Sequence, residues 1–152
     1  MVIKGEQVVL EPATIDELDV IYQWENDPDY WLVSNTVVPY TREQIETFLL
    51  NNKDIYETGQ LRLMIKSKDE RIAGCVDLYD FDPKNKRSGI GILIDPIFRG
   101  KGLGLEAINL LATFCFEKLD LNSLYAEVLV TNPSSIKLFE SAHFELTGIK
   151  KA

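Results

Sequence analysis

The sequence predicts one α+β domain in which helices flank a single central sheet. Its 152 residues are the length of one domain, so residues 1–152 are treated as a unit. Apolar residues alternate between the spacing of a strand and that of a helix, in the order β-α-α-β-β-β-α-β-α. A long helical segment separates the last two strands, and this crossover predicts a mixed sheet.

Helix-capping signals define the first part of the chain. A short apolar run at 7–10 predicts a strand. Thr14 and Glu17 have the spacing of a capping box, which predicts that a helix begins there. Thr41 and Gln44 repeat this spacing and predict a second helix.

Polar turns divide the rest of the chain into four strands and two helices. The expected ranges are strands 61–66, 72–79, 89–94 and 123–130 and helices 102–119 and 133–142. Pro133 directly follows Asn132 and takes the first helical position, where its fixed φ is favourable.

The charge of the chain is acidic and uneven. The 24 acidic and 16 basic residues give a net charge of -8, which would repel a phosphate backbone, so we expect no nucleic-acid partner. The segment from Asp16 to Asp29 holds six acids and no base. Two interpretations stay open: a solvated helix face, or an acidic wall that attracts a cationic substrate.

The cysteines and the histidine bear on the protein's redox environment and on metal binding. Cys75 and Cys115 lie within apolar runs, which is typical of reduced core residues in a cytosolic protein. The single histidine, His143, cannot form a histidine-based metal site. No apolar run approaches the roughly 18 residues of a membrane helix. We therefore expect a cytoplasmic protein with no metal and no membrane contact.

The most informative stretch is a glycine-rich turn between a strand and a long helix. Gly100, Gly102 and Gly104 leave backbone N–H groups unshielded at the start of the helix, where the dipole is positive. Arg99 and Lys101 add full charges. The combination predicts binding of a pyrophosphate or a similar dianion.

The spacing of this turn excludes two common phosphate motifs. A P-loop requires a glycine where Asp95 stands. The dinucleotide pattern G-x-G-x-x-G fails because Leu105 takes the place of the third glycine. The pattern that remains is Arg-x-x-Gly-x-Gly, beginning at Arg99.

Three motifs together resemble a known family. The run 99–104 resembles the acyl-CoA pyrophosphate loop of the GNAT superfamily of N-acetyltransferases. The run 132–144 resembles its N-x-x-S-x-x-L-[YF]-x-x-x-G-F segment. Residues 24–28 are similar to the W-x-N-D-P of the branch that contains ribosomal-protein and spermidine acetyltransferases. The resemblance covers essentially the whole chain.

The resemblance implies a fold and a co-substrate. The fold would be a GNAT-like domain with a twisted, mostly antiparallel sheet, about four flanking helices and two splayed parallel strands, 89–94 and 123–130, that hold acyl-CoA. The co-substrate would be acetyl-CoA. The residues implied to bind it are Ile92, Leu93, Ile94, Arg99, Gly100, Lys101, Gly102, Leu103, Gly104, Asn132, Ser135 and Lys137.

The chain departs from the family at the positions that carry proton transfer. Many members use a tyrosine to protonate the departing thiolate, and Phe139 stands there. In the spermidine branch an acidic residue can act as base near the position of Gly89. Substitute bases are Asp77, Asp80 and Glu127, and alternative acids are Tyr79 and Tyr125.

Two further departures concern the end of the chain. His143 takes the place of the family's helix-ending glycine, and histidine tolerates positive φ better than most residues. Relatives continue past Phe144 into one or two more strands, so we expect the C-terminal strands to be missing or truncated.

The resemblance implies acetyl transfer from acetyl-CoA to a primary amine by direct attack. The acceptor would be a small cationic amine, an aminosugar or a protein N-terminus, so its partner is a small molecule or a peptide. Its site would be formed by Trp24, Glu25, Asp27, Tyr30 and Trp31. A homodimer is compatible with this assignment. The alternative is an acyl-CoA-binding relative without transferase activity, which Phe139 and Gly89 favour.

Overall fold

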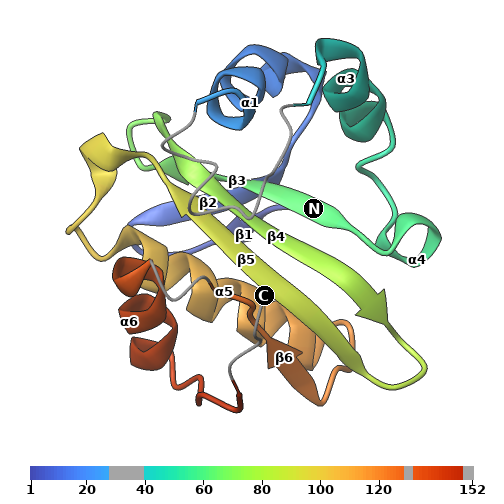
Figure 1. Cartoon of the computed structure of the whole chain (residues 1–152), viewed down its shortest axis with the longest axis vertical. Coiled ribbons are helices and arrows are strands. Elements are labelled where there is room, and N and C mark those ends of the chain that lie inside the picture. Colours follow the sequence, from blue (N-terminus) through green and yellow to red (C-terminus); the bar gives the residue numbers. More distant parts are fainter. Residues whose placement is uncertain (28–39, 129–131, 149–152) are drawn as a thin grey trace.

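One sheet organises the residues that the computed structural model describes, which are 1–27, 40–128 and 132–148 (Figure 1). Within these ranges six strands lie in the order β1-β2-β3-β4-β5-β6. Neighbouring strands from β1 to β5 are antiparallel, and β6 runs parallel to β5. The strands are β1 Ile3–Lys4, β2 Val8–Pro12, β3 Leu61–Ser67, β4 Ile72–Asp82, β5 Arg87–Ile94 and β6 Ser123–Tyr125. The predicted α+β class is confirmed.

Helices pack on both faces of this sheet (Figure 1). Successive side chains of a strand point to opposite faces. On β3, therefore, Leu63 and Ile65 pack in the cluster that contains α5, while Met64 packs with α1 and α3. The helices are α1 Leu18–Glu25, α3 Arg42–Leu50, α4 Ile55–Thr58, α5 Leu103–Glu117 and α6 Pro133–Ser141, with 3-10 turns at Ile15–Glu17 and Pro96–Phe98.

Both predicted capping boxes are present. The Thr14 side chain accepts from the Asp16 N–H at 3.3 Å, and Glu17 Oε1 accepts from the Thr14 N–H at 2.9 Å. A 3-10 turn therefore precedes α1. At the start of α3, Thr41 Oγ1 accepts from Gln44 N–H at 3.1 Å and Gln44 Oε1 accepts from Thr41 N–H at 2.8 Å. These bonds satisfy N–H groups that the helices leave without partners.

The structure differs from the prediction mainly in the length of the last strand. Of the expected strand 123–130, Ser123–Tyr125 form β6, residues 126–128 are irregular, and residues 129–130 lie outside the described residues. The strand ends there because its ladder to β5 ends there. The elements β1 and α4 were not predicted, because two to four residues are too short to show a period.

The end of α6 confirms the expected backbone at His143. Its φ is 70°, in the left-handed region. The His143 N–H donates to Glu140 O at 2.9 Å, and the Phe144 N–H donates to Phe139 O at 3.0 Å. The Phe144 ring then packs edge-on against Phe139, with 5.1 Å between ring centres, and fixes the place of Phe139.

A buried asparagine connects the α1–α3 layer to the sheet. Asn52 is 4% exposed and follows α3. Its Nδ2 donates to Ala13 O and Arg62 O, both at 2.9 Å. Its Oδ1 accepts from Arg62 N–H at 2.9 Å. One side chain thus joins β2, β3 and the end of α3.

Replacing Asn52 by alanine should lower the free energy of unfolding by about 2–4 kcal/mol, because buried backbone groups that lose a partner each cost roughly 1–3 kcal/mol. Urea unfolding measures the loss. Asn51→Ala is the matched control, because Asn51 is exposed and its side-chain amide donates to Thr47 O within the same helix end. It should cost less than about 1 kcal/mol. Equal losses in the two variants would contradict the assigned role.

Candidate active site

The separation of β5 and β6 opens the sheet. Three residue pairs join these strands, and the last is Gly89 with Tyr125. Beyond Gly89, β5 continues to Ile94 and pairs with β4 alone among the described residues. Backbone N–H and C=O groups on its other side are therefore available to a ligand. The expected splay is confirmed, although its second arm loses regular strand geometry after Tyr125.

The loop from β5 to α5 has the geometry of an anion site. Gly100 and Gly102 have φ of 77° and 79°, where a side chain would be strained. A Cβ at Gly100 would meet no atom within 4 Å, so its backbone is open to a ligand. Arg99 Nε donates to Ile94 O at 3.1 Å, which holds the guanidinium at the end of β5. The N-terminus of α5 adds its dipole.

A cavity of about 340 Å³, named here the loop cavity, lies along this loop and the start of α6. Ten of the twelve residues expected to hold acetyl-CoA line it: Ile92, Leu93, Ile94, Arg99, Gly100, Gly102, Leu103, Gly104, Asn132 and Ser135. Lys101 and Lys137 do not. The Lys101 ammonium lies 5.5 Å from the centre of the Phe98 ring. Unshielded glycine N–H groups, a guanidinium and a helix N-terminus fit a pyrophosphate.

Asn132 caps the helix beside this cavity. Its Oδ1 accepts from Ser135 N–H at 3.2 Å, and its Nδ2 donates to Ser135 Oγ at 3.0 Å. Capping uses one hydrogen of the amide and leaves another for a ligand. The predicted cap is therefore present, and a contact to pantetheine is compatible with it.

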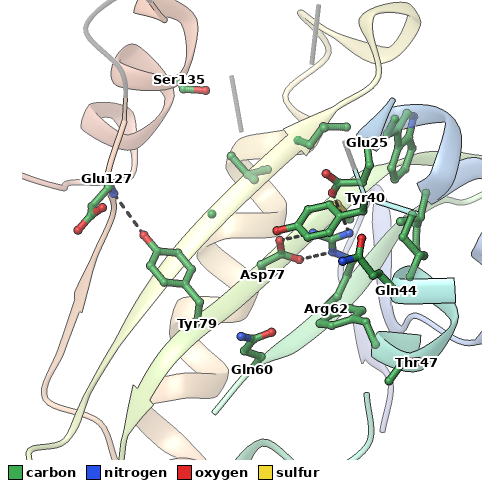
Figure 2. A pocket seen from close by; sticks show the side chains of 18 of the residues that line it. Glu25, Tyr40, Gln44, Thr47, Gln60, Arg62, Asp77, Tyr79, Glu127 and Ser135 are labelled. Atoms are coloured by element: carbon green, nitrogen blue, oxygen red, sulfur yellow. Dashed lines mark hydrogen bonds and ion pairs between the residues drawn. The ribbon is translucent and has the colours of Figure 1, made fainter. Parts of the chain in front are cut away.

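A second cavity, named here the large cavity, has a volume of about 890 Å³ and lies between α1, α3 and the sheet (Figure 2). Ile92, Leu93 and Ser135 line both cavities, so the two adjoin at the opening between β5 and β6. Among the expected acceptor residues, Trp24 and Glu25 line the large cavity, whereas Asp27 does not. The other two, Tyr30 and Trp31, lie outside the described residues.

Asp77, one of the expected bases, forms an ion pair with Arg62. Arg62 Nε and Nη2 donate to the two Asp77 carboxylate oxygens, each at 2.8 Å (Figure 2). Glu25 Oε1 lies 3.5 Å from Arg62 Nη1. Burial lowers the pKa of Arg62, but the neighbouring acids, Asp77 first, outweigh it and raise that pKa well above its usual value. Both carboxylate oxygens of Asp77 accept from the guanidinium, so the geometry favours a structural role over that of base.

Arg62 was missed from the sequence because it carries no motif. It lies directly opposite Asp77 in the register of β3 and β4, and opposite charges at such positions stabilise a sheet. That signal is visible only once the register is known.

Glu127, another expected base, lies at the opening between the strands. Its exposed side chain lines the large cavity, as does Phe139. Its backbone N–H donates to the Tyr79 hydroxyl at 3.4 Å (Figure 2). Burial raises the pKa of Tyr79, so the phenol is protonated at neutral pH. Tyr125 packs edge-on against Tyr79, with 6.0 Å between ring centres, and does not line either cavity.

Comparison with known proteins assigns the class. Residues 7–145 match the family model of the acetyltransferase (GNAT) domain, and the chain belongs to this family. Its acetyl donor is acetyl-CoA, and the protein is an N-acetyltransferase.

Individual relatives place the chain in the predicted branch. It is 28% identical over 147 residues to spermidine N(1)-acetyltransferase of Escherichia coli K12, covering 95% of this chain and 76% of that protein. It is 26% identical over 130 residues to acetyltransferase PseH of Campylobacter jejuni, covering 86% and 78%. Spermidine N-acetyltransferase of Vibrio cholerae, solved with CoA and spermine, superposes with a TM-score of 0.82 at 25% identity, covering 95% and 84%. No helix within the described ranges is long and apolar enough to span a bilayer.

Gly102→Asp should abolish the rise in Tm that CoA causes, because it places a carboxylate where the pyrophosphate is expected. In the parent, CoA at 100-fold its Kd should add roughly 2.7 kcal/mol of stability. Gly102→Asn is the matched control: it has nearly the same shape, tolerates positive φ and carries no charge. It should retain a larger Tm rise than Gly102→Asp. A parent that shows no rise at millimolar CoA would contradict the assigned loop.

Proposed function

We propose that the protein transfers the acetyl group of acetyl-CoA to a primary amine of a small polycationic molecule, a di- or triamine. The observation that carries this is the charge of the large cavity. Among the described residues, four carboxylates line it, from Glu25, Glu43, Asp77 and Glu127, against one guanidinium, that of Arg62. Since Arg62 is bound to Asp77, the surplus is negative and suits a ligand with several positive charges.

The acidic segment from Asp16 to Asp29 divides between the two earlier interpretations. Glu25 lines the large cavity. Asp19 is exposed and pairs with Arg42 at 2.8 Å, and Asp16 lies in the exposed turn before α1. The geometry therefore supports the substrate interpretation for Glu25, and Glu43 of α3 adds a second carboxylate to the same cavity. For Asp16 and Asp19 it supports a solvated helix face.

The size of the cavity and the named relatives support the same acceptor. A volume of about 890 Å³ is within the range of small-molecule sites, roughly 300–1,000 Å³. Spermidine acetyltransferases are among the relatives matched over 95% of the chain.

Direct attack places distinct demands on the residues of the site. The acceptor nitrogen must lose a proton, and Glu127 is the carboxylate at the opening whose geometry supports that role. Backbone N–H groups of β5 beyond Gly89 would polarise the thioester carbonyl. The Arg99 loop would hold the pyrophosphate and fix the donor's position.

The first test is release of free CoA thiol with a panel of amines: triamines, diamines, monoamines, aminosugars and short peptides. A triamine should give the highest kcat/KM. Preference for a monoamine or a peptide would overturn the proposed acceptor. Amine-dependent turnover by the parent would also exclude the alternative that the chain only binds acyl-CoA.

Glu43→Gln should raise the KM for a triamine about fivefold, because each unit-charge attraction is worth on the order of 1 kcal/mol in water at 4 Å. It should also flatten the rise of that KM with salt. The KM for acetyl-CoA should change little. Glu46→Gln is the matched control, since Glu46 lies exposed on the same helix and lines neither cavity. Identical salt profiles in the two variants would contradict the role of Glu43.

A further inference from the structure

The large cavity lacks the two groups that the family pattern would place at the reacting atoms. Phe139 lines it without a hydroxyl, and Gly89 has no side chain at all. The reaction still needs a proton for the departing thiolate. A proton donor on another element that reaches the opening between β5 and β6 would serve this step.

Tyr79 of β4 reaches that opening by lying across β5. It is the register partner of Gly89. A Cβ at Gly89 would lie 2.2 Å from Cε2 of the Tyr79 ring, so the ring takes the space that a side chain at 89 would need. At Gly91, two residues along, a Cβ would lie 3.7 Å from the same ring. The two glycines thus form the surface over which the ring extends.

A local irregularity fixes this direction. The register between β4 and β5 shifts after Tyr79, and the next residue, Asp80, has φ of 49°. Bulges of this kind re-aim neighbouring side chains. Ser88 Oγ donates to Tyr79 O at 3.1 Å and holds the backbone at the shift. The orientation of Tyr79 is therefore imposed by the sheet.

The phenol oxygen lies at the opening between β5 and β6. It accepts the Glu127 N–H at 3.4 Å, and Figure 2 shows it directed from β4 across β5 to the segment after β6. Tyr79, Glu127, Ile92 and Phe139 line one cavity. In this bond the hydroxyl oxygen is the acceptor, so the bond does not use the phenol proton. Burial keeps the phenol protonated by raising its pKa.

We propose that Tyr79 is the catalytic acid of this acetyltransferase and replaces the hydroxyl absent at Phe139. The acceptor nitrogen, as the neutral amine, forms a bond to the acetyl carbon. The carbon–sulfur bond breaks, its electron pair goes to sulfur, and the Tyr79 hydroxyl proton goes to that sulfur. The proton lost by the nitrogen passes to the Glu127 carboxylate or to solvent, and the tyrosinate is reprotonated from solvent. The products are the acetamide and the CoA thiol.

The first experiment removes only the hydroxyl. Tyr79→Phe should lower kcat about 10²-fold, the lower end for loss of a general acid, since a thiolate is a good leaving group. The Tm rise caused by CoA should persist, which shows an intact fold and loop. Tyr56→Phe is the matched control, because Tyr56 is 62% exposed and lines neither cavity. It should keep parental kcat.

The second experiment restores a hydroxyl at the position of Phe139. Phe139→Tyr should raise kcat more in the Tyr79→Phe background than in the parent, because the two hydroxyls would serve the same step. A purely structural role of Tyr79 predicts the same factor in both backgrounds and would overturn the proposal. So would parental kcat in Tyr79→Phe, or a larger loss in Tyr125→Phe.

The acceptor used is the best amine of the panel, whichever class it belongs to. The inference rests on acetyl transfer and not on a polyamine acceptor. If that amine is a peptide, the proposed acceptor fails and the Tyr79 comparison is still decisive.

Discussion

Beyond Gly89, β5 has no partner on its β6 side among the described residues, and the site is arranged around that missing partner. Unpaired backbone groups at a sheet edge favour an extended ligand that completes the ladder. Both helix N-termini near this edge follow from the topology, because α5 begins just after β5 and α6 follows the segment after β6. One interruption of the sheet therefore creates the binding edge and brings two helix starts to it (Figure 1).

Features that depend on a few neighbouring residues could be predicted from the sequence. The capping boxes at Thr14 and Thr41 satisfy N–H groups within one turn, so their spacing is sufficient evidence. The glycine loop is equally local, since Gly100 and Gly102 adopt left-handed backbone at little cost whatever surrounds them. His143 after α6 also has positive φ, which histidine tolerates better than most residues. Ten of the twelve residues expected around this loop line the loop cavity, whereas four further lining residues, Phe98, Leu105, Ser134 and Leu138, were not expected.

Features that depend on the pairing of distant strands could not be predicted from the sequence. A shift of one residue in register moves every side chain to the other face. The contact of Tyr79 with Gly89 and the ion pair of Arg62 with Asp77 therefore become visible only with the registers of β4–β5 and β3–β4. Asp77 was expected as a base for this reason, because its charge was apparent and its partner was not. Gly89 was interpreted as evidence against transferase activity, because its contact with the Tyr79 ring is not visible in the sequence.

The charges of the two cavities also bear on how a product would leave. The loop cavity presents Arg99 and a helix N-terminus, and the large cavity presents Glu25, Glu43 and Glu127. A polyanionic donor and a polycationic acceptor would thus enter from opposite ends and meet at the opening between β5 and β6. Under the proposed function, acetylation converts one ammonium into a neutral amide. The acceptor then loses charge attractions that are each worth on the order of 1 kcal/mol in water at 4 Å. The three glutamates of the large cavity would therefore bind the product less tightly than the amine.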